Sequence, residues 1–213
     1  MLWILTGIVA SYLVGSIPTA YIFGRLLKGI DIRTFGSGNV GATNALRVLG
    51  KGPGITVLLL DILKGFVAVA LLGNILAPYT TLIPIGTLRI ILGIACICGH
   101  NWTIFLKFKG GKGVATTLGV LLGFSATISC LKFVFALAIL TWLFAFLLCR
   151  YVSLASIITG IALPVYMFFF SRSAVLVILG ITLCIFIILR HTQNIIRLMK
   201  GQEPRLRFKK KSS

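Results

Sequence analysis

The chain has 213 residues, 58% of them hydrophobic, and its mean hydropathy of +1.08 excludes an ordinary water-soluble domain. Its 21 Lys and Arg face only three acidic residues, and the formal charge of +18 suits anionic ligands and an anionic membrane surface. Nucleic acid is excluded as a partner, because a soluble basic surface with interleaved aromatic residues is missing. The five cysteines lack metal-site spacing, so we expect no metal and no cofactor.

Apolar runs long enough to cross a membrane, roughly 17 to 25 residues, occur along the whole chain. The run Val114–Leu148 has 35 residues, and at ~1.5 Å per residue it is too long for a hydrocarbon core of about 30 Å. We therefore expect it to turn back near Ser125–Lys132. The sequence predicts an all-α integral membrane protein with seven transmembrane helices, or five if this run is one helix and another segment does not span. The other candidates are Leu2–Phe23, Ile55–Ala77, Leu82–Cys98, Leu154–Phe170 and Ala174–Leu189.

The distribution of basic residues favours seven crossings, because Lys and Arg concentrate in cytoplasmic loops. With the N-terminus outside, only Arg89, Lys132 and Arg172 lie on the outer side, which leaves 21 − 3 = 18 basic residues inside. The C-terminus is then cytoplasmic. So are the conspicuous polar segments Gly29–Gly54, Gly99–Gly113, Arg150–Ser153 and Arg190–Glu203.

The first polar loop, GSGNVGATNALR, has the composition of an oxyanion site. Its glycines permit positive φ angles, so that successive N–H groups can point into one concavity. A short helix ending at Gly50 is expected to follow, and its N-terminus would add a favourable dipole. A flexible loop with polar caps is the alternative. The candidate residues are Gly36, Ser37, Gly38, Asn39, Gly41, Thr43, Asn44 and Arg47.

The second loop, GHNWTIFLKFKGGKG, is expected to form a second anion site. Its glycines lead directly into a helix, so amide donors and a helix N-terminus would lie beside several lysines. It is not a Walker A loop, because Gly113 replaces the Ser or Thr and Leu106 the first glycine. Membrane anchoring by the lysines and helix capping by His100 are the alternatives. The candidates are His100, Lys109, Gly110, Gly111, Lys112 and Gly113.

The segment RHTQNIIRLMKGQE is expected to be a short interfacial helix ending at Gly201. On a helical wheel Asn194 lies on the same face as Arg190 and Arg197, and His191 borders that face. His191 and Asn194 are candidate site residues, although a plain membrane anchor explains the arginines equally well. Ser153 is expected to be the N-cap of the next helix, with ligand contact as the alternative. We expect the basic tail 204–213 to bind lipid headgroups.

The acidic residues are too few for most carboxylate or metal chemistry. Asp61 and Lys64 lie three apart in the second helix, where a structural ion pair is expected and contact of Lys64 with ligand is the alternative. Phe105 occupies the place that an Asp would need for an HxxxxD pair with His100. Acyl transfer from a donor with a good leaving group, such as phosphate, fits this set of residues, because approximation and oxyanion stabilisation can lower most of the barrier.

The stretches SGNVGATN with Arg47, GHNWTIFLKFKGGKGVAT and HTQNIIRLMKGQE resemble the three signatures of the bacterial acyl-phosphate:glycerol-3-phosphate acyltransferase family, in order and at suitable spacing. The resemblance spans nearly the whole chain. It implies that a fatty acyl phosphate acylates the 1-hydroxyl of glycerol 3-phosphate, giving lysophosphatidic acid and phosphate as the first step of phospholipid synthesis. Thr103 stands where the family usually has proline, and Thr192 where arginine is common.

The resemblance also implies roles for residues. Ser37, Arg47 and Lys112 would make the central phosphate contacts, and His100, His191 and Asn194 would complete the catalytic group. The proton acceptor stays open between His191, His100 and a substrate phosphate oxygen. The remaining candidates would bind substrate: Gly36, Gly38, Asn39, Gly41, Thr43, Asn44, Lys109, Gly110, Gly111, Gly113 and Ser153.

The expected protein is a single domain, 1–213, of the bacterial plasma membrane, with its site facing the cytoplasm. Its partners would be the two substrates and membrane lipids, and a monomer is compatible with this role. A transporter or channel for phosphate esters is the alternative. A permeation path would need polar residues deep in several helices, whereas the polar groups here cluster at one end.

Overall fold

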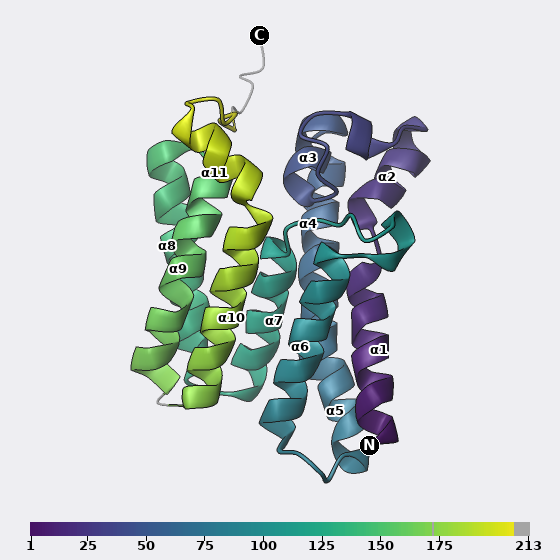
Figure 1. The fold of residues 1–213 in the computed structure, drawn as a ribbon, viewed down its shortest axis with the longest axis vertical. Helices are drawn as coiled ribbons and strands as arrows, with labels where there is room; N and C mark the ends of the chain where they lie inside the picture. Colours follow the sequence, from purple (N-terminus) through teal and green to yellow (C-terminus); the bar gives the residue numbers. More distant parts are fainter. Residues whose placement is uncertain (172, 207–213) are drawn as a thin grey trace. The chain divides into compact units, whose positions relative to one another are not determined.

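The computed structural model describes residues 1–171 and 173–206, and in that part of the chain every regular element is a helix (Figure 1). Five helical segments are long and apolar enough to span a membrane, or six if the bent pair α10 and α11 is one span. These features confirm the all-α membrane class. By its internal contacts the chain separates into two units, Met1–Phe135 and Ala136–Ser213.

The first unit contains the elements up to α7 and the start of α8. Its longest helices are α1, α4 and α6, and shorter ones connect them. The elements are α1 (Leu2–Ser16), α2 (Thr19–Lys28), η1 (Ile32–Thr34), α3 (Ala42–Val48), α4 (Lys51–Phe66), η2 (Val67–Leu72), α5 (Gly73–Leu76), η3 (Ala77–Tyr79), α6 (Ile85–Asn101), η4 (Ile104–Leu106) and α7 (Val114–Thr127).

The first apolar run forms one candidate span, Leu2–Lys28, but its helix is interrupted and is not continuous over Leu2–Phe23. α1 ends at Ser16, and α2 begins at Thr19 after Ile17 and Pro18. Proline lacks an N–H group and disfavours helical geometry at the residue before it, which explains the break. α2 then extends to Lys28 and ends at Gly29, whose φ of 66° is left-handed.

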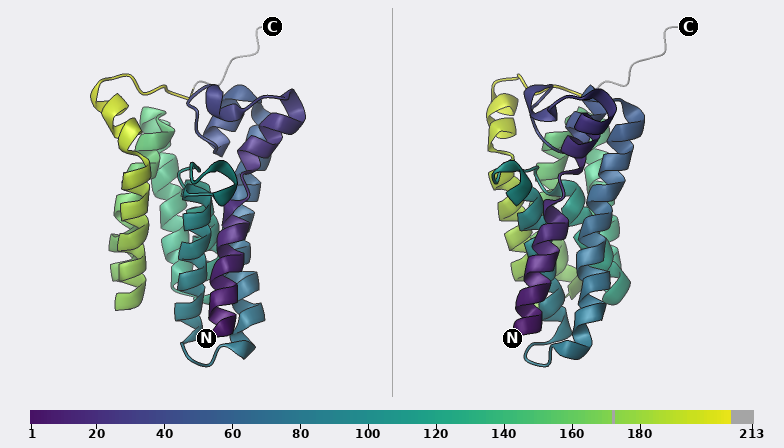
Figure 2. Two further views of the ribbon diagram at one scale, coloured as in Figure 1. Left: turned by 45° about the vertical axis from the view of Figure 1, so that its right-hand side comes forward. Right: turned by 90° about the vertical axis from the view of Figure 1, so that its right-hand side faces the viewer.

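Small residues let the helices of the first unit approach closely. α1 lies alongside α6 (Figure 1), and a Cβ on Gly15 or Gly99 would overlap the backbone of the facing helix. Gly65 and Gly119 serve the same purpose between α4 and α7. Such small-residue contacts are typical of helices that pack in a membrane. The N-terminus lies at one end of this unit, and α2 with η1 and α3 at the other (Figure 2).

The long apolar run is divided as expected. α7 ends at Thr127 and α8 (Leu131–Cys149) begins after a short break, within the predicted Ser125–Lys132 region. The 14 residues of α7 extend about 21 Å, less than a hydrocarbon core of about 30 Å. The seven crossings and their orientation therefore remain predictions.

The second unit contains the rest of α8, α9 (Val152–Ser171), α10 (Ala174–Arg190) and α11 (Thr192–Met199). α9 and α10 pack together where Gly180 approaches the backbone of Pro164. α11 turns away from α10 by 61°. It ends near Gly201, whose φ is 64°, as the sequence predicted. Arg172 and residues 207–213, which include most of the predicted lipid-binding tail, lie outside the described residues.

Candidate active site

The first polar loop is held in shape by Asn44, which lies in α3 and is buried. Its Oδ1 accepts a hydrogen bond from the Ser37 amide at 2.9 Å, and its Nδ2 donates to the carbonyls of Ile32 and Phe35 at 3.2 and 3.1 Å. Gly36 has a φ of 60°, and a Cβ there would overlap Asn44 Oδ1. Asn44 therefore shapes the loop, and its predicted contact with substrate stays a prediction.

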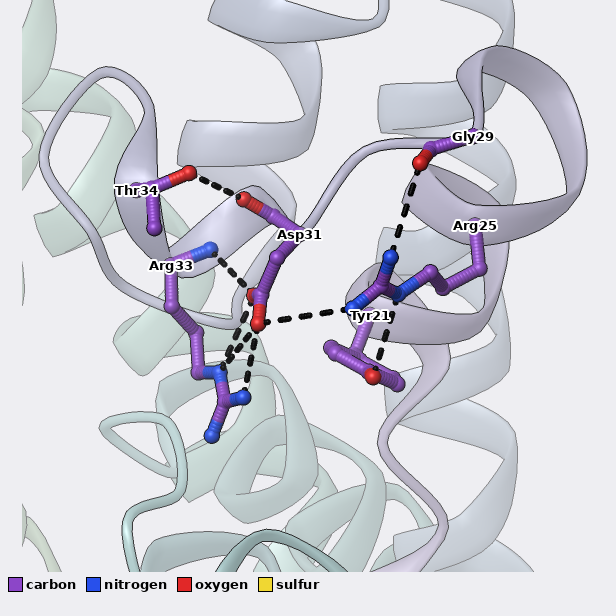
Figure 3. A network of polar contacts seen from close by, with 6 residues as sticks. All are labelled: Tyr21, Arg25, Gly29, Asp31, Arg33 and Thr34. Atoms are coloured by element: carbon purple, nitrogen blue, oxygen red, sulfur yellow. Dashed lines mark hydrogen bonds and ion pairs between the residues drawn. The ribbon is translucent and has the colours of Figure 1, made fainter.

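An acidic residue fixes the segment just before this loop (Figure 3). Asp31 accepts hydrogen bonds from the backbone and side chain of Arg33, and its Oδ2 lies 2.7 Å from Arg33 Nη2 and 3.8 Å from Arg25 Nη2. Arg25 also donates to the Tyr21 hydroxyl. The hydrogen bond from the Arg33 side chain is the main reason that the pKa of Asp31 falls from 3.8 to about 2. This cluster ties α2 to η1.

The two polar loops meet over one hydrophobic core. Val40 of the first loop and Leu106 of the second are buried in the same cluster, together with Ile32, Ala45 and Val57. The sequence separates the loops by more than fifty residues, so their meeting is a result of the fold. Among the remaining first-loop candidates, Asn39, Gly41 and Thr43 are half-buried, whereas Ser37 and Arg47 are exposed.

Two glycine amides of the second loop make hydrogen bonds within the protein. The Gly110 amide donates to the carbonyl of Asn101 at 3.2 Å, and the Gly111 amide to the carbonyl of His100 at 2.9 Å. In the first loop the Gly38 amide donates to Phe35 at 3.0 Å. These amides and that of Ser37 close the loops by hydrogen bonds within the protein, and the predicted anion sites of the two loops stay a prediction.

The two candidate lysines of the second loop differ in exposure. Lys109 is exposed, and Lys112 is half-buried directly before α7. Gly113 has a φ of 75°, which supports the turn into α7, and a Cβ there would overlap Asn101 Oδ1. Thr103, at the position where the family usually has proline, donates to the Ser16 carbonyl at 2.5 Å and accepts from the Phe105 amide at 3.3 Å. It thereby anchors the loop to the end of α1.

A buried ionic group lies beneath the loops. Asp61 and Lys64 form the expected ion pair, with 2.8 Å between Asp61 Oδ1 and Lys64 Nζ. The Thr19 hydroxyl donates to the same Asp61 oxygen at 2.7 Å, and His100 Nδ1 lies 3.8 Å from it. Thr19 is a member of this group that the sequence did not single out, since a threonine after a proline is an ordinary helix-start residue.

A small cavity connects this group with both loops. It is lined by Thr19, Lys64 and His100, and also by Val40 and Gly111 from the two loops. The rest of its wall lies at the break between α1 and α2 and is made by Gly15, Ser16, Ile17, Pro18 and Thr103. The cavity therefore brings together parts of the first loop, the second loop and the buried ion pair.

In the second unit, two of the three predicted site residues, Ser153 and Asn194, converge on Glu203. Its Oε1 accepts hydrogen bonds from Ser153 Oγ at 2.7 Å and Asn194 Nδ2 at 2.6 Å, and its Oε2 lies 2.8 Å from Arg197 Nε. Burial raises the pKa of Glu203, but these hydrogen bonds outweigh it, so that the pKa lies below its ordinary value of 4.5. Sequence reasoning missed Glu203 as a site residue. The signal that could have found it is a single acidic residue that follows a helix with several basic residues.

Two further predictions concern this unit. Ser153 is the second residue of α9 and donates to Glu203, so the prediction that it caps the helix is wrong. His191 is 2% exposed at the junction of α10 and α11, and its Nδ1 lies 2.7 Å from the Ile187 carbonyl. That hydrogen bond fixes the ring at the bend. The catalytic role of His191 stays a prediction.

Comparisons with known proteins agree with the motifs. The family model described as glycerol-3-phosphate acyltransferase matches residues 5–201. A glycerol-3-phosphate acyltransferase of Acaryochloris marina is 43% identical, over 98% of this chain and 96% of the relative. That of Halalkalibacterium halodurans is 42% identical, over 99% and 98%.

Solved structures show the same similarity in three dimensions. The crystal structure of PlsY (YgiH), an integral membrane glycerol 3-phosphate acyltransferase, in its glycerol 3-phosphate form has a TM-score of 0.81 and 39% identity, covering 96% of each chain. Its lysophosphatidic acid form has a TM-score of 0.78. The motifs, the helical membrane fold and these matches over nearly the full length show that the chain belongs to the glycerol-3-phosphate acyltransferase family.

Proposed function

We propose that this membrane acyltransferase uses a fatty acyl phosphate as donor and acylates the 1-hydroxyl of glycerol 3-phosphate, producing lysophosphatidic acid and inorganic phosphate. One observation carries the proposal: residues of both signature loops pack in one hydrophobic core and line one cavity. Lys112 follows Gly111 of that cavity wall in the chain, and Arg47 is exposed in α3, whose Ala45 belongs to the same core. Cationic side chains from separate motifs thus belong to one compact unit, as a substrate with a phosphate group requires. The relatives named for glycerol 3-phosphate support the acceptor.

The reaction needs one bond to form and one to break. The hydroxyl oxygen of glycerol 3-phosphate attacks the carbonyl carbon of the acyl phosphate and forms the ester bond. The bond from that carbon to the bridging phosphate oxygen breaks, and phosphate leaves with the electron pair. The hydroxyl proton passes to a base, for which His100, His191 and a phosphate oxygen remain the candidates.

The chain contributes mainly charge and position to this reaction. Arg47 and Lys112 would neutralise phosphate as negative charge shifts onto the leaving group. Ser37, Lys109 and the half-buried polar residues of the first loop would orient the substrates. Because phosphate is a good leaving group, we propose that the transfer needs neither a metal ion nor acyl-CoA.

The proposed location is the bacterial plasma membrane, with the loops on the cytoplasmic side. The excess of basic residues in those loops supports this orientation. The acyl chain of the donor would lie among the apolar helices and the water-soluble acceptor would enter from the cytoplasm.

Donor identity can be tested directly with purified protein in lipid vesicles. Palmitoyl phosphate and glycerol 3-phosphate, with EDTA present, should give lysophosphatidic acid and an equal amount of phosphate. Palmitoyl-CoA and palmitoyl-acyl-carrier protein should give none. Product formed only from one of the thioesters, or only after a divalent metal is added, would overturn the proposal.

The acceptor provides a matched control. Glycerol has the same attacking hydroxyl but no phosphate, so we expect it to remain unacylated at concentrations that saturate with glycerol 3-phosphate. Equal rates with both acceptors would contradict a site that recognises phosphate.

A further inference from the structure

Asp61 is an unusual residue for its position. It lies in α4, a helix of a membrane-spanning segment, and is only 1% exposed. A carboxylate in such a place is costly unless it is paired. Thr19 and Lys64 both bind its Oδ1, whereas its Oδ2 is buried without a hydrogen-bond partner in the described part of the chain.

The contacts of this pair reach three helices. Lys64 Nζ also donates to the Ile17 carbonyl at 3.3 Å, next to the proline that separates α1 from α2. Thr19 begins α2, and His100 lies in the last turn of α6. Asp61 therefore lies where the break in the first span, α4 and the end of α6 meet.

His100 transmits this arrangement to the second loop. On one side its Nδ1 faces Asp61 at 3.8 Å. On the other side its Nε2 abuts Gly111, where an added Cβ would overlap the ring, and its carbonyl accepts the Gly111 amide at 2.9 Å. Lys112 is the next residue. The position of the His100 ring thus limits where the backbone before Lys112 can lie.

Stability alone does not account for such a pair. Replacing a buried ion pair by apolar residues of similar volume is often neutral or stabilising, whereas removing one partner is strongly destabilising. A pair that only filled space could therefore be replaced by apolar residues without loss. Three residues in contact with Asp61, namely Thr19, Lys64 and His100, line the cavity together with Val40 and Gly111, so the pair is linked to the site through them.

We infer that Asp61, with Lys64 as its counter-charge, is a positioning residue: it holds His100, and His100 holds the Gly110–Gly113 loop that presents Lys112. This inference rests on the proposed function, because Lys112 is taken to bind a substrate phosphate. Asp61 itself contacts no substrate in this scheme.

The test compares turnover of a neutral double variant with that of the wild type. Asp61→Asn combined with Lys64→Met removes both charges without leaving one unpaired. We expect a folded protein whose kcat/KM is lower by about 100-fold, the scale of a small misplacement near reacting groups. Arg89→Gln is the control, since Arg89 lies near the other end of α6 and bonds Asn74; its kcat/KM should stay at the wild-type value.

A double-mutant comparison separates positioning from a general loss of stability. If Asp61 acts through Lys112, adding Lys112→Ala to the double variant should give a kcat/KM no lower than that of Lys112→Ala alone. Gly111→Ala, which overlaps the His100 ring, should lower kcat/KM like the double variant. Size-exclusion chromatography and thermal unfolding in detergent confirm that each variant is folded.

Several outcomes would overturn the inference. A folded double variant with wild-type kcat/KM would do so, as would a triple variant whose losses multiply. If the double variant does not fold, Thr19→Val replaces it in the test, because this substitution removes one hydrogen bond to Asp61 without changing charge. A roughly tenfold lower kcat/KM supports the inference. An unchanged kcat/KM overturns it. Wild-type turnover with a thioester instead of acyl phosphate would refute the proposed donor, and the same variants would then be compared with that thioester.

Discussion

Replacing Glu203 by Ala should release the C-terminal helix of the second unit. The carboxylate is 8% exposed and accepts hydrogen bonds from Ser153, Asn194 and Arg197. Two of these residues belong to α11 and one to α9. The substitution therefore removes the main polar link that the structure shows between the end of the chain and α9.

The expected size of the effect follows from burial of the three partners. Ser153 and Asn194 are 4% and 5% exposed, and leaving each donor without an acceptor costs about 1 to 3 kcal/mol. The Arg197 side chain is 35% exposed, so its pairing adds at most about 1 kcal/mol. The sum is roughly 2 to 7 kcal/mol. Glu203→Gln keeps an oxygen for Ser153 and Asn194 and should cost only about 1 kcal/mol.

Hydrogen exchange of the α11 amides, followed by mass spectrometry, measures this directly. A loss of about 4 kcal/mol in local opening free energy corresponds to exchange about a thousandfold faster. Glu203→Gln should exchange less than about tenfold faster. Thr182→Ala is the control, since the Thr182 hydroxyl bonds a carbonyl of its own helix. If exchange of residues 192–199 is the same in Glu203→Ala and the wild type, this explanation of the helix is wrong.

Three further predictions concern the first unit. Lys112→Ala and Arg47→Ala should each lower kcat by roughly 100- to 1,000-fold, because a cation at the leaving phosphate is lost. Thermal unfolding of both variants should be unchanged. Near-normal turnover of a folded variant would contradict the placement of the site. Asn44→Ala should destabilise the first loop by roughly 2 to 4 kcal/mol through the loss of buried hydrogen bonds to the backbone, seen as faster exchange of residues 35–41; unchanged exchange would refute its role as the loop anchor. The stabilisation that Asp31 provides relative to Asp31→Asn should be complete above about pH 3.8 and disappear as pH falls to about 2, because a carboxyl whose pKa is lowered on folding stabilises only while ionised. Unfolding of both proteins across this pH range tests it, and a difference that grows on acidification would contradict the sign.

The lengths of the apolar runs and the positions of glycine and proline predict much of the fold. The run Val114–Leu148 is too long for one crossing, and the chain does break between Thr127 and Leu131. Gly50 and Gly201 end helices as expected. Pro18 could have predicted the break in the first run by the same reasoning, but hydropathy across it is uninterrupted and a kinked helix was equally compatible. The π-helical segment Val67–Leu72 has no comparable signal.

The candidate site was less predictable, because hydrogen-bond partners depend on tertiary contacts. Glycine spacing indicates which amides could bind an anion, but the carbonyls of Asn101 and His100 take the amides of Gly110 and Gly111 only once the loop has folded back. Spacing within one helix was sufficient for the Asp61–Lys64 pair. Glu203 accepts hydrogen bonds from Ser153 of α9 and Asn194 of α11, and no pattern within one segment of the sequence predicts these contacts.

The position of bond cleavage tests the proposed reaction most directly. Palmitoyl phosphate carrying ¹⁸O in the bridging position can be incubated with the protein and glycerol 3-phosphate, and both products analysed by mass spectrometry. Attack on the carbonyl carbon predicts that all the label leaves with phosphate and that lysophosphatidic acid contains none. Label retained in a fatty acid, with the phosphate group transferred elsewhere, would contradict acyl transfer.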